Sequence, residues 1–123
     1  MRRQKFVNRI VIFCLLLLPG QVISDGTIPG WNELVYLIYR IEVTNYCGLT
    51  TDQVIAGFHL QRKTMLDQYR LEKPLIESAR SEARKLSYEE WGNRGLGGFR
   101  PWCRNEATLY ANQFVRALNP AQK

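Results

Sequence analysis

The first 24 residues constrain this chain most, because they have the pattern of a segment that is removed before the protein folds. Four basic residues and no acidic one stand among the first nine, and an apolar run follows at 10–18, ended by Pro19 and Gly20. This order is typical of a secretory signal peptide. A membrane-spanning helix needs about 20 apolar residues, so this run is too short to span a bilayer. We expect cleavage after Ser24 and a mature domain of residues 25–123; an uncut N-terminal anchor is the alternative.

Removal of this segment changes the charge argument. The whole chain has a net charge of +6. The mature part keeps 13 basic and 11 acidic residues, so its net charge is only +2. Proteins that bind nucleic acids concentrate positive charge on one face, whereas acidic and basic residues alternate along this chain. The sequence therefore argues against a nucleic-acid partner.

Two cysteines, Cys47 and Cys103, remain in the mature chain. Export would place them in an oxidising space, where an even pair indicates a disulfide. Such a bridge would contribute roughly 4 kcal/mol by restricting the unfolded chain. The alternative is a reactive thiol at Cys103, which begins a predicted helix where a thiolate would be favoured. No C-x-x-C pair is present, so we predict the structural bridge.

Helical spacing dominates the first half of the mature chain. Residues 31–46 are mostly apolar and predict a helix that Gly48 ends, with a strand as the alternative. A second helix is expected to begin at Thr50, because Gln53 lies at capping-box spacing. Gly57 within it indicates the close approach of another helix, since glycine costs about 1 kcal/mol there relative to alanine. The apolar face of this helix contains Val54, Phe58, Met65 and Tyr69.

Pro74 must kink the second helix or begin a third one, and helical spacing resumes at residues 76–86. Glycines at 92, 95, 97 and 98 predict a loop over 92–101. Pro101 would then open a last helix. One face of that helix carries Cys103, Ala107, Tyr110, Phe114 and Ala117. The sequence predicts a single all-α domain, a small bundle of three or four antiparallel helices cross-linked by one disulfide.

Motifs that would specify a reaction are missing from the sequence. His59 is the one histidine, and its position beside the apolar face indicates a packed or half-exposed side chain rather than a metal ligand. No G-x-S-x-G motif is present. Adjacent Glu89 and Glu90 would point about 100° apart on a helix, which suits a glycan hydrolase poorly. We expect no metal and no cofactor, and consider an enzyme the less favoured class.

The glycine-rich segment carries the candidate binding residues. Its arginines stand next to a predicted helix start, which attracts anions, and arginine suits carboxylate or phosphate. The candidate ligand-binding residues are Arg94, Arg100, Trp102 and Arg104. The competing interpretation, which we favour, is a turn whose aromatic residues fill the core and whose arginines face water.

Together these features predict an exported helical protein that acts by binding, in the periplasm if the source is bacterial and secreted otherwise. The expected partner is another protein of the cell envelope or a small anionic ligand. The alternative is a small ligand-binding protein or a minimal hydrolase that uses the segment Arg94–Arg104. The oligomeric state is left open by the sequence.

Overall fold

The computed structural model of this protein describes residues 27–121, which form helices joined by short turns. The elements are α1 (Trp31–Tyr46), α2 (Asp52–Tyr69), α3 (Lys73–Trp102), the π-helical turn η1 (Cys103–Ala107) and α4 (Thr108–Leu118). The predicted all-α class is confirmed, and residues 31–46 form a helix rather than a strand. The predicted signal peptide 1–24 and its cleavage site after Ser24 lie outside the described residues.

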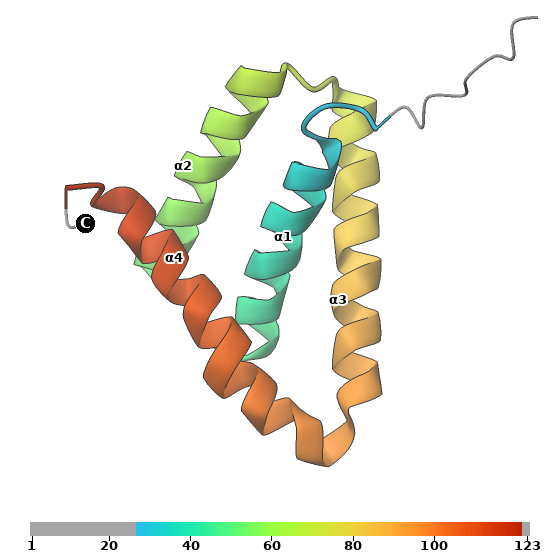
Figure 1. The fold of residues 1–123 in the computed structure, drawn as a ribbon, viewed down its shortest axis with the longest axis vertical. Helices are drawn as coiled ribbons and strands as arrows, with labels where there is room; N and C mark the ends of the chain where they lie inside the picture. The colour runs from blue at the N-terminus through green and yellow to red at the C-terminus, as the bar shows by residue number, and fades with distance from the viewer. Residues whose placement is uncertain (1–26, 122–123) are drawn as a thin grey trace, which may run out of the picture.

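Consecutive helices alternate in direction, and α1 lies between α2 and α3 (Figure 1). The most extensive contacts join α1 to α3, which run side by side in the same direction. Small residues four apart on α3, namely Ala79, Ala83 and Ser87, are fully buried. They allow the two backbones to approach closely, because they project little beyond the helix surface.

The core is built mainly from α1 and from the C-terminal third of the chain. Its largest fully buried apolar side chains are Leu34, Leu37, Val43, Trp102 and Phe114. The buried hydroxyl groups of Thr44 and Ser87 form hydrogen bonds within their own helices. Thr44 donates to the carbonyl oxygen of Ile41 at 2.7 Å, and Ser87 donates to that of Arg84 at 3.0 Å. The bundle therefore hides these polar groups without an unpaired hydroxyl.

Helices α2 and α4 meet at Gly57, as the sequence predicted. A Cβ at this position would overlap the backbone carbonyl of Phe114. The neighbouring Phe58 packs its ring edge-to-face against that of Phe114, with centroids 5.9 Å apart. Only glycine lets the two helices approach this closely.

Gly48 ends α1, also as predicted. It adopts φ +67°, a left-handed conformation that glycine accepts readily. Its N–H donates to the carbonyl of Asn45 at 3.0 Å, and the N–H of Leu49 donates to that of Thr44 at 2.9 Å. These are the two hydrogen bonds of a Schellman motif, which satisfies the last carbonyls of the helix.

The N-cap of α2 is Thr51, so the predicted cap at Thr50 is wrong by one residue. The Thr51 hydroxyl accepts a hydrogen bond from the N–H of Val54 at 3.3 Å. Thr50 is instead the middle residue of a tight turn, in which the N–H of Thr51 donates to the carbonyl of Leu49 at 3.0 Å. The turn that leaves α1 therefore shifts the cap one residue along the chain.

Helix α3 starts at Lys73 with Pro74 in its first turn. Of the two alternatives that the sequence left open, the structure has the new helix and not a kink. The predicted loop over 92–101 is wrong, because helical hydrogen bonding continues to Trp102. Pro101 consequently lies inside the end of α3 and does not open the last helix.

The chain nevertheless reverses its direction near the glycines. Arg94 and Glu106 are in contact, with Nη2 and Oε1 3.5 Å apart, whereas twelve residues of straight helix would separate them by about 18 Å. Figure 1 shows this turn at the lower end of α3, from which the chain rises into α4. Pro101 and the π-helical turn follow this reversal, and both interrupt the regular helical hydrogen bonding. The bend is made by distorted helix instead of by a loop.

The predicted disulfide between Cys47 and Cys103 is present, with the two Cα atoms 5.3 Å apart. It joins the end of α1 to the start of η1 across 56 residues of sequence. Chain-entropy arithmetic for a loop of this length gives about 4 kcal/mol. The bridge therefore holds the bend against the C-terminal end of α1. Within residues 27–121, no helix has the length and apolar character needed to cross a membrane.

Candidate functional site

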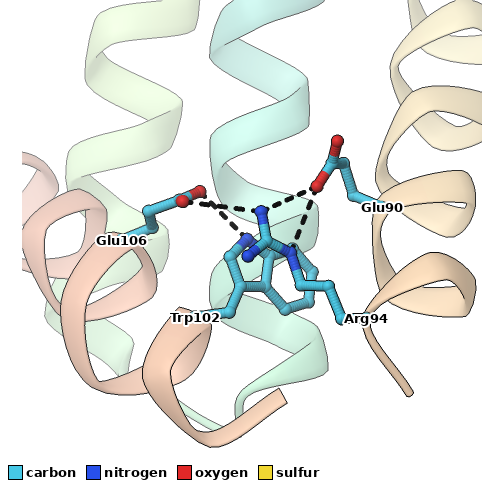
Figure 2. A network of polar contacts seen from close by, with 4 residues as sticks. All are labelled: Glu90, Arg94, Trp102 and Glu106. Atoms are coloured by element: carbon cyan, nitrogen blue, oxygen red, sulfur yellow. Dashed lines mark hydrogen bonds and ion pairs between the residues drawn. The ribbon is translucent and has the colours of Figure 1, made fainter. Parts of the chain in front are cut away.

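Arg94, the first of the sequence-predicted site residues, already has its charge partners within this chain (Figure 2). Its Nη2 and Nε donate to Oε2 of Glu90 at 2.7 and 3.1 Å, and its Nη2 lies 3.5 Å from Oε1 of Glu106. The guanidinium also lies over the ring of Trp102, 5.0 Å from its centroid. We call these four residues the Arg94 cluster. Because two carboxylates already neutralise Arg94, it offers little to an external anion.

Trp102 is part of the core and does not form the wall of a site. Only 1% of its surface is exposed, and its rings pack against those of Tyr46 and Phe99 at 6.4 and 6.1 Å. Its indole N–H donates to Oε2 of Glu106 at 3.0 Å (Figure 2). The Arg94 cluster thus joins α3 to η1 across the bend.

Arg100 and Arg104 are exposed and are not brought to Arg94 by the fold. Neither forms an ion pair with any residue of the described range 27–121. The four predicted binding residues are therefore divided. Arg94 and Trp102 lie together inside the Arg94 cluster, while Arg100 and Arg104 face water.

A groove of about 370 Å³ lies elsewhere, between α2 and α3, with α1 as its floor. We call it the basic groove. Its apolar lining comes from Ile38, Ile41 and Phe58, and its polar lining from Glu42, His59, Arg62, Arg80 and Arg84. Helices α2 and α3 contribute all of its basic residues.

Positive charge exceeds negative charge along the basic groove. Among its lining residues Glu42 is the only carboxylate, and its Oε1 lies 3.6 Å from Nε of Arg84, whose side chain stays 64% exposed. Arg80 has a loose contact of 3.5 Å with Glu77, outside the groove. Arg62 forms no ion pair with a residue of the described range. Guanidinium groups of this kind can hold a carboxylate or phosphate with two parallel hydrogen bonds.

Aromatic side chains continue this surface along α3. Tyr88 and Trp91 follow Arg80 and Arg84 at spacings of four and three, which keeps them on one face of the helix. Trp91 stacks on Tyr46 of α1, with centroids 5.7 Å and planes 12° apart, and lies 5.9 Å from the ring of Tyr88. Tyr88 is 61% exposed and Trp91 42% exposed. We call these three rings the aromatic platform.

Sequence reasoning missed the basic groove because its arginines lie on two helices that are separate in sequence. The available signal was the spacing of Arg80, Arg84, Tyr88 and Trp91 beside the small buried residues of α3. That spacing indicates a face that adjoins the helix contact but is not filled by it.

A second groove flanks the same α1–α3 contact on the other side. This tyrosine groove is lined by Asn32, Val35, Tyr36, Tyr39, Leu86, Glu89, Glu90 and Asn93. Burial raises the pKa of Tyr39 above its usual value, and the nearby carboxylates of Glu90 and Glu106 add to this effect. The phenol therefore stays neutral at physiological pH. Glu90 is committed to Arg94, so this groove has less unpaired charge than the basic groove.

Arg40 of α1 forms hydrogen bonds to both α2 and α4. It donates from Nη1 to Gln113 at 2.8 Å and from Nη2 to Gln61 at 3.3 Å. Its guanidinium lies 5.0 Å from the ring centroid of Tyr36 and 5.3 Å from that of Phe114. Burial lowers the pKa of Arg40. This arginine has a packing role between α1, α2 and α4.

His59 is exposed at the edge of the basic groove, with its ring 5.3 Å from that of Phe58. Within residues 27–121 no group of three or more histidine, cysteine or carboxylate side chains is placed to hold a metal ion. The absence of a cofactor stays a prediction from the sequence.

Comparisons with known proteins found no matching family, no matching curated protein and no matching solved structure for this chain.

Proposed function

We propose that this chain is an exported protein that acts by binding, and that its basic groove receives an anionic partner. One observation carries the proposal: Arg62 from α2 and Arg80 and Arg84 from α3 surround an apolar floor. Glu42 is the one carboxylate among the residues that line the groove. A partner that brings negative charge would complete this surface. Arginine is also among the residue types that contribute most to binding energy.

The exported location rests on the N-terminal charge and apolar pattern. The disulfide and the lack of a membrane-spanning helix among residues 27–121 are compatible with it. An oxidising compartment is where such a bridge persists. The partner would be a protein of the same compartment or a small anionic molecule. The proposal assigns no catalytic step.

The alternative that places a ligand or a hydrolytic site on the segment Arg94–Arg104 has less support. Its first arginine, Arg94, is already paired with Glu90 and Glu106, and Trp102 is buried. Breaking those pairs to bind a ligand would leave carboxylates without their partner, which costs free energy. We therefore do not propose this segment as the site.

Titration of isotope-labelled mature protein with tetraglutamate at 0.15 M salt, followed by NMR amide shifts, tests the proposal. Shifts are expected on the groove-facing sides of α2 and α3. The double variant Arg62→Ala/Arg84→Ala should weaken binding about fivefold or more, the effect of losing about 1 kcal/mol.

A matched control is Lys73→Ala/Lys85→Ala, which removes the same charge from α3 outside the groove. It should leave the affinity within about twofold at 0.15 M salt, where charges more than about 8 Å apart are screened. Equal weakening by both double variants, or shifts confined to other helices, would reject the basic groove as the binding surface.

A further inference from the structure

The basic groove and the aromatic platform follow one another along the same face of α3, and this arrangement points to the kind of partner. We propose that the partner is an extended peptide segment with acidic residues at one end and aromatic or large apolar residues at the other. The acidic end lies among the arginines and the apolar end on the platform. This inference rests on the proposed function and adds the chemical class of the partner.

The order of residue types along the surface supports a peptide whose acidic and apolar residues form separate blocks. Helices α1 and α3 run in the same direction, so both present charged side chains first and aromatic side chains further along the chain. Glu42 lies beside Arg84, and further along both helices Tyr46 stacks on Trp91. Positive charge is therefore confined to one end of the surface and aromatic area to the other. A complementary partner must separate its negative and apolar groups in the same way.

The length of the surface suits a short extended chain. Arg80 and Trp91 are eleven positions apart on α3, which corresponds to about 16 Å of helix. An extended peptide advances about 3.3 Å per residue, so about five residues span this distance. One or two carboxylates could then reach the arginines while the following side chains lie on the rings.

The shape of the surface favours a peptide over a lipid. The arginines border a concave groove rather than a flat face, so a bilayer plane could not reach its floor. The platform is open, with Tyr88 61% and Trp91 42% exposed, so an acyl chain lying on it would keep much of its surface in water. An extended peptide needs less enclosure, because alternate side chains can face the solvent. Aromatic side chains also gain from offset or edge-to-face contacts with exposed rings.

Two capped pentapeptides of identical composition test the inference. In the segregated peptide, acetyl-Glu-Glu-Gly-Phe-Phe-amide, the acidic and aromatic residues form separate blocks. In the interleaved peptide, acetyl-Phe-Glu-Gly-Glu-Phe-amide, no placement puts both carboxylates at the arginines and both rings on the platform. The segregated peptide should bind about tenfold more tightly, and its titration should shift both the Arg84 amide and the indole N–H of Trp91.

Variants of the platform separate this inference from the proposed function. Tyr88→Ala and Trp91→Ala should each weaken binding of the segregated peptide severalfold and leave tetraglutamate binding within about twofold. Tyr88→Ala serves as the second variant because that side chain is the more exposed and the less involved in packing. Circular dichroism would establish that each variant is folded.

The outcomes are distinguishable. Equal affinity for the two pentapeptides, with tetraglutamate still bound at the arginines, would overturn the segregated peptide but keep the basic groove. Failure of all three peptides to shift the groove would overturn both proposals. Sedimentation with phosphatidylglycerol vesicles that depends on Trp91, in the absence of peptide binding, would replace the peptide with a lipid surface and overturn the inference.

Discussion

The Arg94 cluster, on one side, and the basic groove with its adjoining aromatic platform, on the other, both combine arginine, glutamate and tryptophan, but they differ in how far these side chains are paired and buried. In the cluster, Arg94 contacts two glutamates and lies over a tryptophan that is almost completely buried. In the groove, Arg84 has one long contact with Glu42, and Trp91 on the same helix face is 42% exposed. The first set of contacts is complete within the chain, and the second is not.

This difference shows that a group of arginines indicates a binding site only where the protein does not supply the opposite charge itself. Removal of one partner from a half-buried pair leaves charge behind and destabilises the fold. Exposed ion pairs contribute little to stability, so their arginines can engage an external anion at small cost.

The largest expected difference is between the two tryptophans. Trp102→Ala should destabilise the protein by about 3–5 kcal/mol, because it empties a fully buried position and removes the indole donor to Glu106. Trp91→Ala should cost about 1 kcal/mol or less, because much of that ring already faces water. Urea denaturation of the two variants measures this. Similar losses in both would mean that the aromatic platform is a packing feature and not a binding surface.

A smaller contrast is expected between the two arginines. Arg94→Ala should reduce the free energy of unfolding by about 1 kcal/mol, a modest value because its carboxylate partners are nearly half exposed. Arg84→Ala should change it by less than about 0.5 kcal/mol. The order should reverse for tetraglutamate binding, which Arg84→Ala weakens and Arg94→Ala leaves nearly unchanged. Chemical denaturation and NMR titration of the same two variants would reveal any departure from this reversal.

Much of the fold could be predicted because its signals are local. Periodic apolar residues indicated the helices, Gly48 and Gly57 indicated an end and a close approach, and the cysteine count indicated the bridge. The segment 92–101 was predicted incorrectly because its glycines disfavour helix by about 1 kcal/mol each. Contacts between residues distant in sequence, namely the disulfide and the Arg94 cluster, fix both ends of the segment and make the chain bend there.

The candidate site was less accessible to sequence reasoning. Arg62 and Arg84 are 22 positions apart, and only the placement of α1 between α2 and α3 brings them to one groove. Conversely, Arg94, Arg100 and Arg104 are near one another in sequence, but the bend joins Arg94 to Glu106 and leaves the other two in water. Proximity along the chain therefore predicted a set of residues that the fold divides between the Arg94 cluster and the solvent.

The smallest expected effect comes from Arg100→Ala/Arg104→Ala. Both side chains are exposed, and neither lines the basic groove, so the free energy of unfolding should change by less than about 0.5 kcal/mol. The variant removes the same charge as Arg62→Ala/Arg84→Ala, yet tetraglutamate affinity at 0.15 M salt should stay within about twofold of the original. The two double variants lose the same charge at different places. Isothermal titration calorimetry of both therefore shows whether the place of the arginines determines the affinity for tetraglutamate. If Arg100→Ala/Arg104→Ala weakens binding as much as Arg62→Ala/Arg84→Ala, then the end of α3 attracts the anion as well. The segment Arg94–Arg104 would then have the binding role that its sequence indicated.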